Sequence, residues 1–237
     1  MNAPSDFDTQ ASPRSTSPLQ TVFTTSLAQE SHDIIRHLGR VLDLQKGEQV
    51  LLIPGDGALA ALTLVSNYGC EVSVLAGAAS DGTIQPADEH ISLEVGSIDG
   101  LPFEAERFDA VIVAVPVTAR LQRVARELAR VLKRSGRLGM VALSLYRDQV
   151  ADEAGDVALQ HSQGHGQIRP AAAYRAVLGE AGFTAFLHED RRRELRRSAQ
   201  AIYRQHMIEP AAPSNATLEL LAAGGVSMTL ITAEKGL

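Results

Sequence analysis

The sequence contains no tryptophan and few aromatic residues, which make up 4% of its 237 residues. Because single-stranded nucleic acids stack their bases on aromatic side chains, this composition argues against a stacking platform for such a ligand. The formal net charge of −6 argues more generally against binding to nucleic acid or to an anionic membrane, since both need a basic surface. We therefore expect neither a nucleic acid nor a membrane among the partners.

Cysteine and long apolar runs are also scarce. Cys70 is the single cysteine, which excludes an intrachain disulfide and a cysteine-based metal cluster, and we expect no metal centre. No segment approaches the roughly 18 consecutive apolar residues of a membrane-spanning helix. The N-terminus lacks the charged start and apolar stretch of a secretory signal. These absences favour a cytoplasmic location.

The apolar residues that are present, 45% of the chain, are mainly aliphatic. Aliphatic runs are typical of parallel strands buried on both faces of a sheet. Residues 1–20 are rich in Ser, Pro, Thr and Asp and cannot offset the entropy of their own ordering. We therefore expect a disordered tail over residues 1–20 and one α/β domain over residues 21–237.

Apolar strands alternate with amphipathic helices along most of this domain, which predicts a doubly wound, mostly parallel sheet with right-handed crossovers. A 3–4-residue spacing of apolar side chains predicts the helices, and Ser135-Gly136 is expected to end the third of them. The expected strands are 49–54, 71–76, 91–95, 108–115, 137–145, 183–188 and 226–233, and the expected helices are 26–42, 58–68, 119–133, 170–181 and 190–206.

Three segments resemble class I, Rossmann-like methyltransferases that use S-adenosylmethionine. They are QVLLIPGDG, LPFEAERFDAVIV and RELARVLKRSGRLGMVAL, they occur in the order of that family, and they span roughly residues 45–145. The first is similar to a subgroup that reads PGDGEG, as in tellurite-resistance-type thiol methyltransferases. The resemblance implies methyl transfer from S-adenosylmethionine, and a final strand pair within 183–233 that adds a C-terminal antiparallel strand.

The resemblance also implies which residues bind the cofactor. Gly55, Asp56 and Gly57 would line the methionine end, where glycines allow a tight turn and a helix N-terminus can meet a carboxylate. Ser97, Ile98 and Asp99 would line the adenine end. In the family, the acid that contacts the adenine amine falls on the position of Ser97 here, and Asp99 is close enough to substitute for it.

Other positions depart from the family pattern on the same side of the pocket. Leu59 replaces the third glycine of the first loop. Ala76 stands where the family ends its second strand with the carboxylate that binds the ribose hydroxyls, and Asp81 lies five residues on. Gly82 and Pro86 interrupt a segment that is helical in the family. We therefore weigh an intact S-adenosylmethionine site against an altered one.

The sequence offers no titratable side chain directly after the fourth expected strand, where the family often places a base, so the catalytic residue stays unassigned. His161 and His165, four residues apart in QHSQGHGQ, are candidates for binding substrate, with a polar loop as the alternative. His32 and His37 are expected to face solvent. Cys70 is expected to be a small core residue.

Arg191–Arg197 contains the one concentrated positive charge of the chain, on the expected helix 190–206. This helix could clamp an acidic substrate or partner, or it could present a solvated face paired with its own acids.

Two functions follow. The first is an S-adenosylmethionine-dependent methyltransferase for a small molecule, in which proximity does most of the catalysis. The second is a catalytically inactive relative that serves as a binding or scaffolding subunit for a protein partner. An exposed strand pair at the C-terminal edge could also mediate a homodimer.

Overall fold

The computed structural model describes residues 32–53, 57–77, 88–115, 117, 120–145, 168–207 and 225–236. The expected tail over residues 1–20 and the histidines 161 and 165 lie outside these ranges. The strands are β1 (Gln49–Ile53), β2 (Glu71–Ala76), β3 (Ile91–Val95), β4 (Phe108–Val113), β5 (Leu132–Leu145), β6 (Arg169–Pro170), β7 (Phe183–Asp190) and β8 (Val226–Lys235). The helices are residues 32–41, α2 (Gly57–Tyr68), α3 (Leu121–Val131), α5 (Ala171–Glu180) and α6 (Arg192–Met207).

The strands form one sheet in the order β3-β2-β1-β4-β5-β8-β7, with the short β6 paired to the end of β5. Strands β1 to β5 are parallel, and β8 runs antiparallel to both β5 and β7. The order reverses between β1 and β4, and ligands of open α/β sheets bind at the carboxyl ends of the strands at such a point. The expected doubly wound sheet with a C-terminal antiparallel strand is confirmed.

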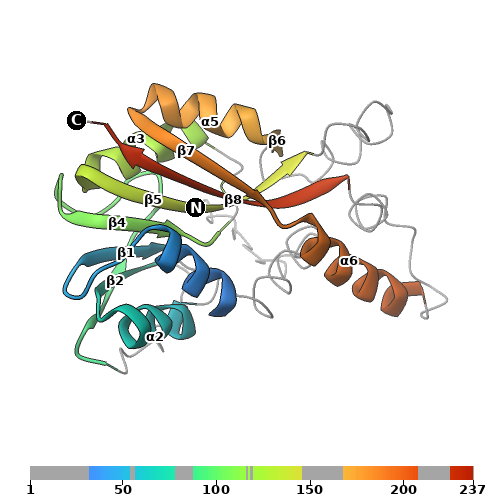
Figure 1. The fold of residues 1–237 in the computed structure, drawn as a ribbon, viewed down its shortest axis with the longest axis horizontal. Coiled ribbons are helices and arrows are strands. Elements are labelled where there is room, and N and C mark those ends of the chain that lie inside the picture. The colour runs from blue at the N-terminus through green and yellow to red at the C-terminus, as the bar shows by residue number, and fades with distance from the viewer. Residues whose placement is uncertain are drawn as a thin grey trace, which may run out of the picture.

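Helices cover both faces of the sheet (Figure 1). The helix at residues 32–41 (the N-terminal helix) and α2 pack on one face with side chains from α6, whereas α3 and α5 pack on the other. In α3, the side chains spaced three or four residues apart are buried, and the arginines between them are largely exposed, as the periodicity predicts. Gly69 ends α2 with a φ of +66°, a conformation that glycine adopts without strain.

Several element boundaries differ from the expectation by one or two residues, and the largest difference lies at the start of β5. The structure begins β5 at Leu132, directly after α3, rather than at Arg137. Leu132 pairs with Phe108 and Arg137 pairs with Ala110, so the strands advance five residues along β5 but only two along β4. The residues that the sequence suggests as a helix stop, Ser135 and Gly136, therefore form an irregularity within the strand, where Ser135 has a φ of +57°.

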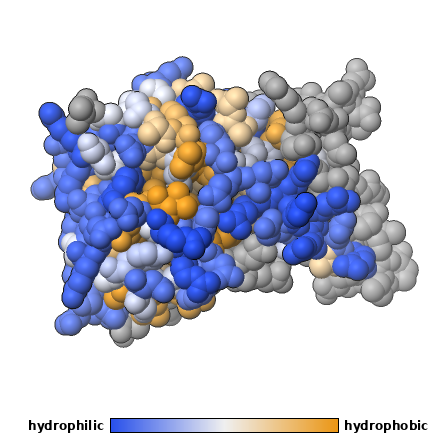
Figure 2. All heavy atoms as spheres, in the orientation of Figure 1, coloured by the Kyte–Doolittle hydropathy of each residue, from blue (hydrophilic) through white to orange (hydrophobic). Residues whose placement is uncertain are grey.

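Among the described residues, no helix combines the length and the apolar character needed to cross a lipid bilayer. Hydrophilic side chains cover most of the face shown in Figure 2, and apolar atoms gather over the β7–β8 part of the sheet. Leu187 of β7 contributes to the apolar surface of the molecule, with 61% of its area exposed.

Candidate active site

The first part of the candidate site lies where β1 leads into α2. β1 ends at Ile53, and α2 begins at Gly57, while Gly55 and Asp56 fall outside the described residues. The first backbone N–H groups of a helix have no partner within the helix and carry a partial positive charge. The start of α2 at the carboxyl end of β1 therefore offers donors to an anionic group. Leu59, in the first turn of α2, is 48% exposed.

The second part is the end of β2. Ala76 is the last residue of the strand, is 4% exposed, and pairs with Val95 of β3. The end of this strand is thus the residue that the sequence predicts. Gly77 follows in an exposed position, and a methyl group added to its Cα would contact no atom within 4 Å. A side-chain carboxylate is absent from this strand end as far as Gly77, where the described residues break off.

The third part is the turn after β3, which holds Ser97, Ile98 and Asp99. The Ser97 hydroxyl donates to one carboxylate oxygen of Asp99 at 2.5 Å, and Arg120 donates to the other at 2.6 Å. The Arg123 guanidinium also donates to the Asp99 backbone carbonyl at 2.6 Å. The Ser97 hydroxyl and then the Arg120 guanidinium lower the pKa of Asp99 to about 2.

These contacts change the interpretation of Asp99. Each oxygen of its carboxylate already accepts one bond, from Ser97 or from Arg120, so a ligand amine at Asp99 would share the carboxylate with these two partners. Arg120 was missed by sequence reasoning because it lies 21 residues away, at the start of α3. Its backbone is left-handed, with a φ of +53°, a conformation that nothing in the local sequence signals.

Gly96 shapes the same turn. A methyl group on its Cα would lie 2.8 Å from Cδ of Pro102 and 3.1 Å from a terminal carbon of Leu75. The distance to Pro102 is shorter than real Cβ contacts, and the distance to Leu75 is tight, so any larger residue at this position would require Pro102 to move. This close approach positions the LPF segment, residues 101–103, against the end of β2.

The LPF segment is also tied to α3, which explains why two of the three family-like segments occur together. The Arg130 guanidinium donates to the carbonyls of Phe103 at 2.7 Å and Leu101 at 3.0 Å. Glu127 accepts from Arg130 at 2.8 and 3.0 Å and from the Leu101 N–H at 2.9 Å. These bonds, from Arg130 foremost, lower the pKa of Glu127 although burial acts against them. We call this set of contacts the α3 strap.

Asp109, in the FD pair that follows the LPF segment, has a structural role. One of its oxygens accepts from the Gln49 backbone N–H at 2.9 Å, and the other accepts from the Lys133 ammonium at 2.7 Å. Burial alone would raise the pKa of Asp109, but these two bonds lower it. Asp109 therefore joins β4 to its two neighbouring strands, at the end of the sheet opposite to the candidate site.

Sequence reasoning also missed Arg169 of β6. This strand pairs with the carboxyl end of β5, Ser144 with Arg169 and Leu145 with Pro170. In the described part of the chain, Nε of Arg169 is the one buried side-chain nitrogen or oxygen without a hydrogen-bond partner. A single arginine in a two-residue strand carries no sequence signal that would have identified it.

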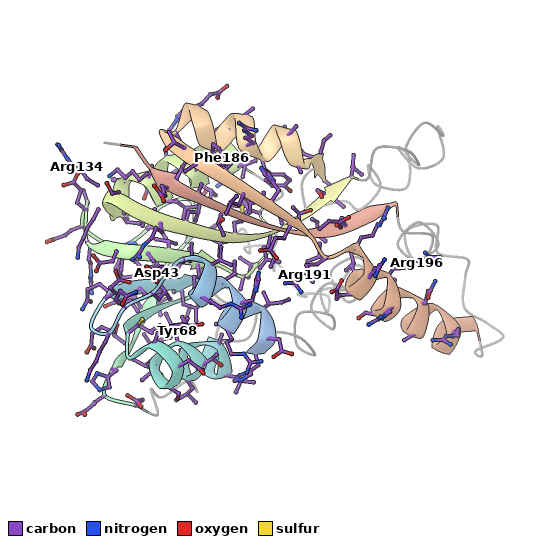
Figure 3. All side chains as sticks on the ribbon, in the orientation of Figure 1. Asp43, Tyr68, Arg134, Phe186, Arg191 and Arg196 are labelled. Atoms are coloured by element: carbon purple, nitrogen blue, oxygen red, sulfur yellow. The ribbon has the colours of Figure 1, made fainter. Side chains whose placement is uncertain are left out.

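A cavity of about 590 Å³ lies apart from these groups, between the N-terminal helix, the end of α2 and the start of α6. Its lining is charged, and most of these charges are paired within the protein: Arg36 with Asp33, and Arg191 with Glu189 and Glu194, while Arg40 donates to His37. Figure 3 places Arg191 where β7 passes into α6. We interpret this cavity as an ion-paired surface groove rather than as the cofactor site.

His37 contributes to this groove, and its expected solvent-facing position is wrong. The His37 side chain is 20% exposed, and its Nε2 lies 2.7 Å from an Oε atom of Glu189, while Nδ1 accepts from Arg40 at 3.0 Å. The cause is a long-range contact, because Glu189 reaches it from 152 residues along the chain. His32 is exposed and lies 2.9 Å from the Thr63 hydroxyl.

Two further expectations can be compared with the structure. Cys70 is fully buried, as expected of a core residue, and burial foremost raises the pKa of its thiol to about 11. In the helix now defined as α6, Leu195 and Ala199 are buried, whereas Arg193 and Arg197 are exposed. Figure 3 shows Arg196 further along α6 than Arg191.

Comparison with known proteins agrees with this geometry. Residues 54–140 match the family model described as "Methyltransferase domain". No curated protein sequence matches significantly. A sarcosine dimethylglycine methyltransferase from Galdieria sulphuraria has a similar structure, with a TM-score of 0.66, 17% identity and coverage of 88% of this chain and 86% of that one.

Two more solved structures share the fold. A geranyl diphosphate C-methyltransferase from Streptomyces coelicolor A3(2) has a TM-score of 0.68 and 14% identity, and the match covers 98% of this chain and 90% of that one. The [4+2]-cyclase SpnF has a TM-score of 0.63 and 18% identity, and the match covers 88% and 82%. The match of residues 54–140 to the methyltransferase domain model and the shared fold both support the resemblance to class I, S-adenosylmethionine-dependent methyltransferases.

Proposed function

We propose that the protein transfers a methyl group from S-adenosylmethionine to a small-molecule acceptor. The observation that carries this proposal is the arrangement of the α2 N-terminus and the Ser97–Asp99 turn on one edge of the sheet, within the segment that matches the methyltransferase domain. The methyltransferases of similar structure act, by their names, on sarcosine or dimethylglycine and on geranyl diphosphate, which supports a small acceptor.

The residues of this edge fit two of the three parts of the cofactor. The N–H groups at the start of α2, with Gly55, Asp56 and Gly57 in the connecting loop, would hold the methionine carboxylate. The Ser97 hydroxyl oxygen and the Ile98 side chain would border the adenine. The ribose differs, because Ala76 offers no carboxylate to its hydroxyl groups.

When bound, S-adenosylmethionine supplies the electrophilic methyl group, which is the chemically demanding part of the reaction. The protein then has to hold the acceptor beside that group and keep water away. Neither task needs a titratable residue after β4, where the sequence has Ala114, Val115, Pro116, Val117 and Thr118. His161 and His165 remain candidates for contacts with the acceptor and lie outside the described residues.

The Asp99–Arg120 pair has a defined role in this proposal. It joins the turn after β3 to the residues that follow β4, two segments on either side of the adenine position. The pair would therefore fix the width of the adenine site, and the acceptor positions that Asp99 has left could still face the adenine amine. Arg120 is 71% exposed on its outer side, whereas the Asp99 side chain is 14% exposed.

A second candidate function is favoured by two of the same observations. Ala76 at the end of β2 and the occupied carboxylate of Asp99 are both unusual for a working cofactor site, and they suit an inactive scaffolding subunit with a protein partner. The cyclase SpnF also shows that the fold does not fix the activity.

Methyl-transfer assays with radiolabelled S-adenosylmethionine would separate the two candidates. The acceptor panel would include sarcosine, dimethylglycine and geranyl diphosphate, with S-adenosylhomocysteine as the competitor that should suppress any product. Product that the competitor suppresses supports methyl transfer. If the protein binds neither the cofactor nor its demethylated form, the scaffolding function is favoured.

A further inference from the structure

One side-chain nitrogen of Arg169 is buried and has no hydrogen-bond partner. Its Nε is shielded from solvent and makes no hydrogen bond, a property shared by no other side-chain nitrogen or oxygen among the described residues. Burying part of a guanidinium is costly unless an acceptor or an opposite charge is supplied. A ligand that supplied the missing acceptor would offset the free-energy cost of burying this nitrogen.

The polar neighbours of Arg169 are already engaged with other partners. The Tyr174 hydroxyl donates to the Leu143 carbonyl at 2.9 Å, and the Ser144 hydroxyl lies 2.6 Å from that of Thr229. Burial raises the pKa of Tyr174 to about 12, and the nearby positive charge of Arg169 acts in the opposite direction. Tyr174 therefore stays neutral, and no carboxylate among the described residues forms an ion pair with Arg169.

The strand geometry places Arg169 at the functional edge. The charge of Arg169 acts on the hydroxyl of Tyr174, and Tyr174 belongs to the core cluster on the face covered by α3 and α5. Arg169 thus lies on the α3–α5 side, where Tyr174 is buried, beside the final residues of β5. This is the carboxyl edge of the sheet, where ligands bind in open α/β folds.

We propose that Arg169 binds the oxyanion group, a carboxylate or a phosphate, of the methyl acceptor. A guanidinium presents its N–H donors in a planar fork that matches two oxygens of such a group, and an anion supplies both the missing acceptor and the missing negative charge. The acceptor part of this inference rests on the proposed methyl transfer, but anion binding by Arg169 does not.

The experiment compares the wild-type protein with Arg169→Met and Arg169→Lys, and with Arg126→Met as the matched control. Arg126 is an exposed arginine of α3, so its replacement changes the net charge equally without affecting the site. Each protein would be titrated with sodium phosphate and with sodium acetate against sodium chloride of equal ionic strength, because general screening must be held constant. The rise in melting temperature with increasing anion concentration, relative to chloride, gives the affinity for that anion.

We expect phosphate, acetate or both to raise the melting temperature of the wild type and of Arg126→Met beyond the chloride reference. Arg169→Met should lose this response, and Arg169→Lys should bind about tenfold more weakly, since the fork is lost. In chloride alone, Arg169→Met should be at least as stable as the wild type, because it no longer buries an unpaired donor. The anion that responds identifies a carboxylate-bearing or a phosphate-bearing acceptor.

Three results would overturn the proposal: no anion response in the wild type, an equal response in Arg169→Met, or a marked loss of stability in that variant in chloride. Titration with S-adenosylhomocysteine on the same samples keeps the two proposals apart. Cofactor binding without an anion response contradicts the Arg169 inference alone. An anion response without cofactor binding contradicts methyl transfer and leaves the oxyanion site in place.

Discussion

The α3 strap gives the sharpest prediction about stability. Replacing Arg130 with Met keeps the aliphatic stem but removes the donors to the carbonyls of Leu101 and Phe103, and the ion pair with Glu127. Hydrogen bonds that involve a charged group contribute about 1.5–3 kcal/mol each when they are buried. The Arg130 side chain is 36% exposed, so water replaces part of that loss.

We therefore expect Arg130→Met to lower the free energy of unfolding by about 2 kcal/mol in total, which is well below the sum of the lost bonds because water can reach the groups that lose their partner. For a chain of this length, about 2 kcal/mol corresponds to a fall in melting temperature of roughly 4–8 °C. Thermal unfolding followed by circular dichroism would measure it. Arg126→Met, an exposed arginine on the same helix, is the control and should shift the melting temperature by less than about 2 °C.

A double-mutant cycle tests whether Arg130 and Glu127 act together. If they form one strap, the variant that carries both Arg130→Met and Glu127→Gln should lose less stability than the sum of the single losses, by about 1 kcal/mol. The reasoning is refuted if Arg130→Met melts like its Arg126→Met control, or if the two single effects simply add.

Three further predictions concern the ligand site, acid stability and the buried thiol. Ala76→Asp should tighten S-adenosylhomocysteine binding about tenfold, because a carboxylate at the end of β2 can accept from the ribose hydroxyls. Unchanged affinity with an unchanged melting temperature would contradict the placement of the ribose. The pKa of Glu127 is lowered in the fold, so its stabilisation is complete above its unfolded pKa of about 4.3 and is lost as the pH falls through the lower folded value. Melting temperature measured from neutral pH down to about pH 3 should thus fall less steeply in Glu127→Gln, and parallel curves would contradict the assignment. Cys70, buried and with a pKa of about 11, should not react with a thiol reagent until the protein unfolds, and rapid labelling of the folded protein would contradict its core position.

The fold could be predicted from local patterns because those patterns have local causes. The apolar spacing of α3, the aliphatic runs of β1 and β4, and the glycine that ends α2 each act within a few residues. The start of β5 was misplaced for the opposite reason. Its pairing with Phe108 of β4 overrides a local helix-stop signal at Ser135-Gly136.

The candidate site was predictable only in part. The positions of Gly57, Ala76 and Ser97 follow from where strands end, which the sequence indicates. The partners of these residues are set by contacts far apart in the chain, as when Arg120 pairs with Asp99 across 21 residues. The missing partner of Arg169 is likewise a property of packing, which no motif records.

The most direct test of the account is a calorimetric titration of the purified protein with S-adenosylmethionine and S-adenosylhomocysteine, with Gly57→Arg as the variant that should fill the turn before α2. The account predicts micromolar binding by the wild type, about −8 kcal/mol, and none by Gly57→Arg. Absence of wild-type binding at millimolar ligand, or equal affinity of the variant, would contradict the proposed cofactor site.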